Sequence, residues 1–310
     1  LPARFFGEIV KKLPQNTFTL ETNDQLQATI TAGSAAFTLN GLSAHDYPQL
    51  PEVEKDYVLT LPVPLFRQVI LQTSIAVSTA ESRPILTGIH MVIANNQLKA
   101  VATDSHRLSQ RIIPLEMLEA SNALTFEITL PGKTLIELSR IIDGLETIDF
   151  AITENQVLFQ TETLSFYSRL LEGRYPDTDR LINDQFNTAI TVVASDLVAA
   201  VDRASLMSHT DKNNIATLSI NENRILLTGN SPEIGKVEEE IMVENYEGAS
   251  LDVSFNPDYL KDALRLFGSS EATIQFLEAN RPFTLTLKDN HSDIPYSFIQ
   301  LVTPVRTFNG

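Results

Sequence analysis

The stretch that decides the fold is LPGKTLIELSRIIDGLETIDFAITENQVLFQTETLSFYS, residues 130–168. Its first part predicts an amphipathic helix of about three turns, and its second part predicts strands, because apolar and polar residues alternate there. The same order occurs in LPARFFGEIVKKLPQNTFTLETNDQLQATITAGSAAFTL at 1–39, and again in FNPDYLKDALRLFGSSEATIQFLEANRPFTLTL at 255–287. The chain is therefore built from an internal repeat.

A second kind of unit lies between these copies. It is seen in YVLTLPVPLFRQVILQTSIAV at 57–77 and in ITVVASDLVAAVDRASLMS at 190–208. Each predicts a strand and then a helix, which opens at Pro64 in the first and is capped by Ser195 in the second. One unit of each kind makes an α+β domain of about 125 residues with pseudo-twofold internal symmetry, present two and a half times. We expect antiparallel sheets with the helices on one face, and a first domain that begins halfway.

Composition narrows the class of protein. The 310 residues are 43% hydrophobic, enough for about two to three domains with real cores. There is no cysteine, so disulfides and thiolate metal sites are excluded. The start lacks the apolar core of a signal peptide, and no apolar run approaches the ~18 residues of a membrane span. A cytoplasmic protein with no membrane partner is expected.

Enzymatic motifs fail on inspection. GKT at 132–134 lacks the earlier glycine of a nucleotide-binding P-loop, since Glu127 occupies that position. The histidines are scattered without paired ligand spacing, which argues against a metal site. They are His45, His90, His106, His209 and His291. No cofactor is implied.

The stretch ATDSHRLS, residues 102–109, places an acid, a serine and a histidine side by side. Its surroundings, QLKAVATDSHRLSQRIIP, predict one extended strand, on which Asp104 and His106 would share a face and Ser105 would point away. A catalytic triad needs the nucleophile within hydrogen-bond reach of the base. We therefore assign no catalytic residue.

Charge is distributed unevenly along the chain. The formal net charge is −16, yet the helices expected at 3–13, 64–76, 131–143, 195–207 and 257–268 hold nine basic residues against seven acidic ones. Basic residues on any one helix are often an ordinary solvated face. Five such helices in an acidic chain favour a shared basic surface. The basic residues are Arg4, Lys11, Lys12, Arg67, Lys133, Arg140, Arg203, Lys261 and Arg265.

Together with the repeat, four motifs resemble the bacterial sliding clamp, the beta subunit of DNA polymerase III. They are ATDSHRLS (102–109), EGRYPDTDRLI (172–182), SFNPDYLKDAL (254–264) and LVTPVR (301–306). The resemblance covers essentially the whole chain. It implies a DNA-clamp fold of repeated domains with two helices each, in which two protomers close head to tail into a ring around duplex DNA. Residues 1–55 would be the second half of domain one, whose first half would be absent, with domain two at 56–183 and domain three at 184–310.

The resemblance also implies the function and the partners. The chain would be a non-catalytic processivity factor that holds the replicative polymerase on DNA. Its partners would be double-stranded DNA, contacted without regard to sequence, the DNA polymerase III catalytic subunit, the clamp loader, other polymerases and repair proteins with a clamp-binding motif, and a second copy of the chain. The nine helical basic residues would then face the DNA.

A hydrophobic peptide pocket between domains two and three is implied in the same way. Its wall would consist of Leu86, Thr103, Ser105, His106, Arg107, Leu108, Pro176, Arg180, Leu181, Asn256, Tyr259, Pro282, Thr284, Leu301, Thr303, Pro304, Val305 and Arg306. Apolar anchor pockets with a few orienting polar groups suit peptide capture. Ring closure would use Phe37 and Leu39 of one protomer against Leu206 and Met207 of the other.

Some positions depart from the family pattern. Ser105 stands where many members have glycine, and the TPV sequence replaces a commoner Met-Pro-Met. Residues 307–310 extend past the usual end. An alternative from another class is a protein-binding scaffold that never encircles DNA, for which the helical basic residues would be dispensable.

Overall fold

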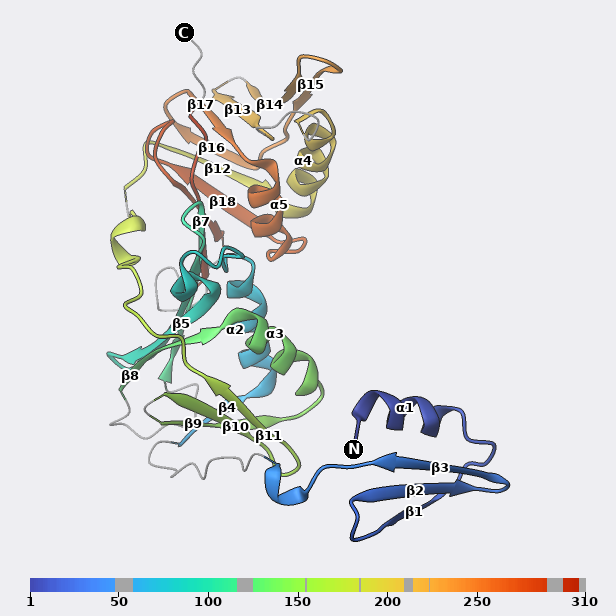
Figure 1. The fold of residues 1–310 in the computed structure, drawn as a ribbon. Coiled ribbons are helices and arrows are strands. Elements are labelled where there is room, and N and C mark those ends of the chain that lie inside the picture. The colour runs from blue at the N-terminus through green and yellow to red at the C-terminus, as the bar shows by residue number, and fades with distance from the viewer. Residues whose placement is uncertain are drawn as a thin grey trace. The chain divides into compact units, whose positions relative to one another are not determined.

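The computed structural model has two compact units, Leu1–Glu52 and Val53–Gly310 (Figure 1). The residues it describes are 1–47, 58–115, 125–153, 155–183, 185–208, 214–222, 224–288 and 298–306. Residues 307–310, expected as a C-terminal extension, lie outside them.

The first unit is one helix and a small antiparallel sheet. The helix is α1 (Ala3–Lys11), and the strands are β1 (Thr19–Thr22), β2 (Gln27–Ala32) and β3 (Ala35–Asn40), in the order β1-β2-β3. A short 3-10 helix, η1 (Ala44–Asp46), follows. Gly33, at φ +59°, makes the tight turn between β2 and β3, a conformation that glycine adopts without strain. The predicted helix and strands are present.

The second unit contains two parts, and the first of them spans residues 58–169. Its helices are α2 (Val63–Ser74) and α3 (Gly132–Ile141), with a short 3-10 helix, η2 (Pro84–Thr87). Its strands are β4 (Val58–Pro62), β5 (Gly88–Ala94), β6 (Gln97–Thr103), β7 (Arg107–Pro114), β8 (Phe126–Pro131), β9 (Thr147–Ile152), β10 (Gln156–Gln160) and β11 (Ser165–Arg169). A 3-10 helix, η4 (Asp179–Leu181), precedes the next part.

The third part repeats this plan. Its helices are α4 (Ala194–Ser208) and α5 (Pro257–Arg265). Its strands are β12 (Thr188–Val193), β13 (Ala216–Asn221), β14 (Arg224–Ser231), β15 (Gly235–Glu240), β16 (Asn245–Gly248), β17 (Leu251–Phe255), β18 (Glu271–Phe276), β19 (Phe283–Leu287) and β20 (Phe298–Val302). All strand pairs are antiparallel, as an α+β fold predicts.

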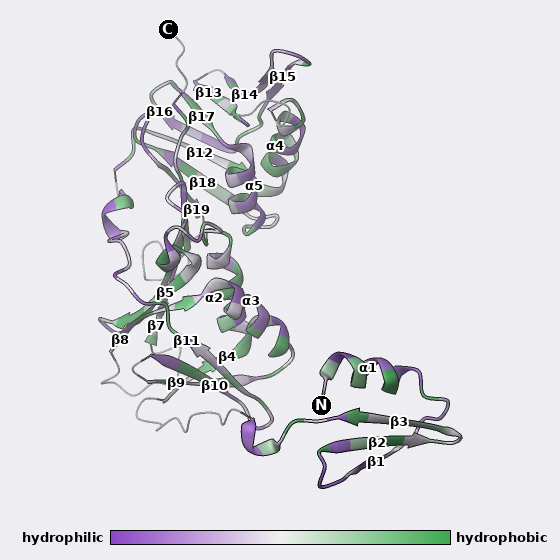
Figure 2. Cartoon of the chain, viewed as in Figure 1, coloured by the Kyte–Doolittle hydropathy of each residue, from purple (hydrophilic) through white to green (hydrophobic). Residues whose placement is uncertain are grey.

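Two hydrophobic cores support these parts. Phe66, Phe150 and Phe159 lie in the first, and Phe255 and Phe276 lie in the second. Figure 2 shows hydrophobic and hydrophilic residues together on the helices, as the amphipathic pattern predicted. Helices α2, α3, α4 and α5 bury their apolar sides, which leaves the polar sides for contacts with solvent or a partner, whereas no residue of α1 is buried.

One sheet joins the two parts of the second unit. Its nine strands run in the order β16-β12-β18-β19-β20-β7-β6-β5-β8, and β7 pairs with β20 at the centre. Leu108 lies opposite Leu301 in this pairing. Below it, the buried Ser109 hydroxyl donates to the Gln72 carbonyl and accepts from the Gln300 side chain, each at 2.6 Å. The motifs at 102–109 and 301–306 are therefore neighbours in space.

The single strand expected across ATDSHRLS is wrong, because β6 and β7 form a hairpin that turns at 104–106. The Asp104 carboxylate accepts from the backbone N–H groups of His106 at 2.9 Å and Arg107 at 3.0 Å, which bends the chain. Ser105 has φ +81° at the apex. The cap expected at Ser195 is also wrong, since α4 begins one residue earlier.

Candidate functional site

The candidate site lies where β7 meets β20. Past the paired strands, the Thr303 backbone N–H donates to the His106 carbonyl at 2.8 Å, and the Val305 N–H donates to the Ser254 carbonyl at 2.7 Å. These bonds hold the C-terminal segment against the hairpin turn and against the end of β17. Four of the expected wall segments are thereby brought together: the turn, the start of α5, β20 and the segment after it.

The base of the site is a small apolar cluster separate from the two large cores. It consists of Leu86, Val101, Leu108, Tyr175 and Leu301, with Ile85 and Ile182 packed against it. Leu86, Leu108 and Leu301 are each 3% exposed or less. The cluster unites η2, the hairpin, the segment before η4 and β20.

Tyr175 fixes the segment before η4 to the hairpin. Its hydroxyl accepts from the Thr103 backbone N–H at 3.0 Å, and its ring stacks on the His90 ring at 4.6 Å between centroids. Burial raises the pKa of Tyr175, so the phenol stays protonated at neutral pH. Burial also lowers the pKa of His90, which favours the neutral ring.

The rim toward α5 is polar. The Arg107 guanidinium lies 4.8 Å from the centre of the Tyr259 ring, a cation–π geometry. It is held on one side by Asp104 at 3.0 Å and on the other by Asp262 of α5 at 2.8 Å. The exposed His106 ring stacks on the same Tyr259 at 6.1 Å. Arg107 therefore links the hairpin turn to α5.

The remaining wall residues differ in exposure. Asn256 caps α5 by accepting from the Asp258 N–H at 2.9 Å. Thr284 is buried in β19 opposite Leu301, and Pro282 lies half-buried just before that strand. Pro304 is half-buried, like Val305, whereas Pro176, Leu181 and Arg306 are exposed. The Arg180 side chain is 86% exposed and pairs with Asp177 at 2.8 Å.

Three residues of this site were missed by sequence reasoning: Tyr175, Asp262 and Arg83. Tyr175 stands directly before Pro176 within a motif already noted, so its aromatic ring was an available signal. Arg83 donates to the Ser105 hydroxyl at 2.9 Å, and Asp262 binds Arg107. Neither contact has a local signal, because the partners are distant in sequence.

The helical basic residues fall into two groups. Lys11, Lys12 and Lys133 are exposed, and no ion pair joins them to another residue of the described part of the chain. The others have carboxylate partners: Arg4 with Glu8, Arg67 with Asp143, Arg140 with Glu137, Arg203 with Glu239, and Lys261 and Arg265 with Asp202. The structure thus separates free basic residues from compensated ones.

Lys261 is the most enclosed of the compensated residues. Its side chain is 14% exposed, and its ammonium lies 3.1 Å from Asp202 of α4 and 3.2 Å from Asp258 of α5. Burial alone would lower the pKa of Lys261, but hydrogen bonds to these two carboxylates outweigh burial and raise it. Lys261 therefore joins α4 to α5.

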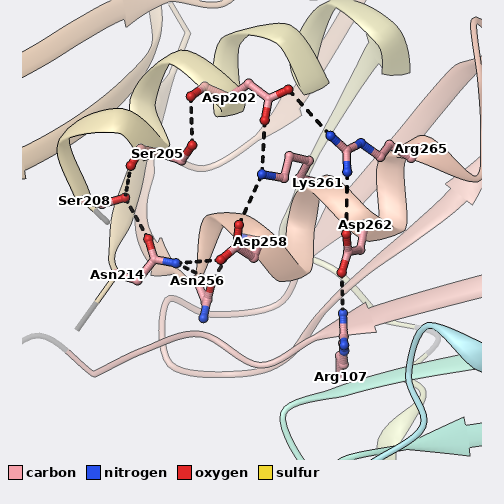
Figure 3. A network of polar contacts seen from close by, with 10 residues as sticks. All are labelled: Arg107, Asp202, Ser205, Ser208, Asn214, Asn256, Asp258, Lys261, Asp262 and Arg265. Carbon is pink, nitrogen blue, oxygen red and sulfur yellow. Dashed lines mark hydrogen bonds and ion pairs between the residues drawn. The ribbon is translucent and has the colours of Figure 1, made fainter. Parts of the chain in front are cut away.

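A polar network runs from the rim into these helices (Figure 3). Asp262 contacts Arg265 at 3.9 Å, and Arg265 contacts Asp202 at 3.8 Å. On the other side of Lys261, Asp258 accepts from the Asn214 side chain at 2.8 Å, and the Asn214 carbonyl accepts from Ser208 at 2.9 Å. The network fixes the end of α4 to the start of α5.

The residues expected at a ring interface lie near unpaired edges. Phe37 is 39% exposed on β3, the last strand of its sheet, and Leu39 on the same strand is half-buried. Leu206 is 65% exposed near the end of α4, beside the half-buried Met207. β15 is likewise an edge strand. Exposed apolar side chains and free edges suit association with another chain.

Two further properties concern only the described residues. They contain no group of three or more His, Asp or Glu side chains arranged to hold a metal ion, and His209 and His291 lie outside them. No helix among them has the length and apolar character needed to cross a membrane.

Comparison with known proteins gives consistent matches over the chain. Family models for the N-terminal, central and C-terminal domains of the DNA polymerase III beta subunit match residues 1–51, 60–177 and 179–300. The beta sliding clamp of Bacillus subtilis is 43% identical over 310 residues, which is 99% of this chain and 80% of that protein. The beta sliding clamp of Streptococcus pneumoniae is also 43% identical over 309 residues, with the same coverage.

Solved structures show the same likeness. A crystal structure of the DNA polymerase III beta chain from Streptococcus pneumoniae matches with a TM-score of 0.91 at 43% identity, covering 99% of this chain and 80% of that one. The DNA polymerase sliding clamp of Bacillus subtilis matches with a TM-score of 0.92 at 42% identity and the same coverage.

Proposed function

The chain belongs to the family of bacterial DNA polymerase III beta subunits, the beta sliding clamps, and from this membership we propose how it works on DNA. It is a DNA sliding clamp, a processivity factor that encircles duplex DNA and tethers a polymerase to it. Enclosure supplies persistence, so only weak contacts with phosphates are needed, and tight ones would hinder sliding. The acidic remainder of the chain repels DNA from other surfaces.

The junction of β7 and β20 is the proposed docking pocket for short peptide motifs of partner proteins. Its support is the apolar cluster around Leu108 and Leu301, bordered by the polar groups of His106, Arg107 and Asn256. Apolar anchors with a few polar groups are what a peptide needs for affinity and orientation. The proposed partners are the polymerase catalytic subunit, the clamp loader and other polymerases and repair proteins with such a motif.

The DNA-facing surface is proposed to be formed by the helices. Lys11, Lys12 and Lys133 are the strongest candidates for phosphate contacts, because their charges are not compensated by a carboxylate in the described structure. Lys261 contributes least, since it is enclosed between Asp202 and Asp258. The arginines that pair with carboxylates attract the DNA phosphates more weakly than Lys11, Lys12 and Lys133 do.

The remaining features of the proposal are the homodimer, the domain boundaries and the location in the cell. Phe37 and Leu39 on β3 of one protomer would meet Leu206 and Met207 on α4 of another, forming a head-to-tail homodimer. We place the domain boundaries at 1–55, 56–183 and 184–310, near the ends of the three family matches. The chain would act without catalysis or cofactor, beside the chromosome in the cytoplasm.

The observation that carries the function is the match of three consecutive beta-subunit domain models in order along the chain. The test is retention on DNA after loading by a clamp loader with ATP. Protein loaded on a closed circular plasmid should stay bound through gel filtration and should be lost after one restriction cut, because a ring slides off an end. Equal retention on circular and cut DNA would contradict encirclement.

A further inference from the structure

The free pocket is closed over its apolar base. Leu86 is 3% exposed and Leu108 is 1% exposed, although both are expected to contact a peptide. A peptide side chain can reach them only if the elements around the base move apart. The contact between those elements that breaks most easily would therefore control entry to the base.

Four of the contacts that join the elements around the base can be compared. The Thr303–His106 bond joins two backbones at 2.8 Å, and the Tyr175 hydroxyl that binds the Thr103 N–H is buried. The Arg107–Asp262 ion pair is largely enclosed, with 17% of the Arg107 side chain exposed. The fourth is the bond from the Arg83 guanidinium to the Ser105 hydroxyl, 2.9 Å long and exposed to solvent. It is the weakest of the four, since water competes for both groups.

The two partners of this bond differ in rigidity. Ser105 stands at the apex of a turn whose N–H groups all have acceptors, in Thr103, Asp104 and the Arg107 carbonyl. Its φ of +81° is one that a residue with a Cβ adopts only under constraint. Arg83 is a long exposed side chain directly before η2, the element that holds Leu86. The turn is therefore held in place by its own hydrogen bonds, and the Arg83 side chain is the partner that can change conformation.

We propose that Arg83 and Ser105 form a latch across the pocket, which must open before a peptide's apolar side chain reaches Leu86 and Leu108. This inference rests on the proposed docking function of the pocket. Opening breaks the bond before the peptide is seated, and the bound state does not re-form it. Loss of the latch therefore speeds association and leaves dissociation unchanged.

The experiment is stopped-flow binding of an uncharged fluorescent peptide containing a glutamine followed by a Leu-Phe pair. It compares the wild-type chain with Ser105→Ala, Arg83→Ala and the double variant. Each single variant should raise the association rate constant about three- to tenfold, the range that one net hydrogen bond spans. The double variant should match the singles, because both changes remove the same bond. Ser105→Gly, which also frees the backbone, should bind as fast as Ser105→Ala.

Controls separate the latch from other effects. Arg224→Ala removes an equal charge from an exposed arginine on β14, and it should leave the rate unchanged. Unchanged or slower association in both single variants, or additive effects in the double variant, would overturn the latch. If the wild-type chain shows no saturable binding at all, the docking function itself is wrong, which is a different result.

Discussion

At the scale of single residues, Arg107 illustrates how the pocket is held together. Its guanidinium spans Asp104 of its own turn and Asp262 of α5 while lying over Tyr259. The ring and both carboxylates act on one group, so the wall depends on Asp262 of α5, which lies in SFNPDYLKDAL but was not among the predicted wall residues. Arginine suits this position because its planar fork can bind carboxylates while its face packs on a ring.

Asp262→Asn tests this link. It removes one carboxylate from the partly buried Arg107 and should lower the free energy of unfolding by about 1 kcal/mol, a modest value because Asp262 is itself 37% exposed. Glu137→Gln is the matched control, since it breaks the exposed Arg140–Glu137 pair and should cost less than about 0.5 kcal/mol. Urea unfolding measures the loss of unfolding free energy in both variants. Equal losses in Asp262→Asn and Glu137→Gln would contradict a structural role for Asp262.

His90 makes stability depend on pH. Burial lowers its pKa below the ordinary 6.5, and Glu127, whose carboxylate lies 3.6 Å away, opposes this only in part. The unfolded chain then binds a proton more readily than the folded chain. The contribution of His90 to stability is therefore full above the pKa of the unfolded chain and is lost as pH falls from there through the lower pKa of the folded chain.

The comparison for His90 is His90→Phe, which keeps an aromatic ring beside Tyr175 but cannot titrate. Between about pH 7 and about pH 5, the unfolding free energy of the wild-type chain should fall more steeply than that of the variant. Urea unfolding at a series of pH values measures both slopes. Parallel curves would show that His90 does not titrate with unfolding.

At the scale of elements, the sequence pattern predicted the five α-helices found in the described residues, with ends within about three residues of those observed. Periodicity served well because α2, α3, α4 and α5 each bury one face, and α1, none of whose residues is buried, is amphipathic as well. It failed at residues 104–106, where apolar alternation continues on both sides of a turn made by the Asp104 side chain. Alternation cannot distinguish one long strand from two strands of a hairpin.

The resemblance placed residues 103–108 and 301–306 in one pocket, but the pairings between residues distant in sequence could not be predicted from local patterns. The pairing of β7 with β20 joins residues about 190 positions apart, as the Ser109–Gln300 bond shows with its separation of 191. The same holds for the basic residues, since Arg203 finds its carboxylate on β15 and Lys261 finds one on α4. A count of helical charges therefore overstated the number that are free to meet a phosphate.

Lys133 and Lys261 should respond differently to replacement by alanine. Lys133→Ala removes an uncompensated charge at the start of α3, so the slope of log affinity for DNA against log salt should become shallower by about 1. Lys261→Ala should leave that slope unchanged but lower the unfolding free energy by about 1–2 kcal/mol, because two carboxylates lose their shared partner.

The measurements for this pair are a salt titration of DNA binding and urea unfolding of each variant. Lys133→Ala should keep its stability within about 0.5 kcal/mol, as expected for an exposed residue. A reversed pattern, in which Lys261 sets the salt slope and Lys133 sets stability, would contradict the division into free and compensated charges.

At the scale of the whole molecule, two protomers are proposed to close the ring through edge strands and exposed apolar residues. Leu206 is the most accessible of the four proposed interface side chains at 65% exposure. Leu206→Asp should weaken self-association at least about tenfold, because a carboxylate would be desolvated in the interface. Leu71→Asp is the control, because Leu71 is an exposed leucine on α2, which contributes none of the four proposed interface residues. Sedimentation at several protein concentrations measures the monomer–dimer distribution of each variant. A distribution for Leu206→Asp equal to that of the wild-type chain would contradict this interface.

The most direct test of the account is peptide binding at the junction of β7 and β20. A fluorescent peptide with a glutamine followed by a Leu-Phe pair is titrated into the chain and into a version ending at Val302, which keeps β20 but lacks Thr303, Pro304 and Val305. Saturable binding to the chain, lost in the folded truncated version, is the predicted result. Absence of binding to the folded full chain, or equal binding by both versions, would contradict the docking site.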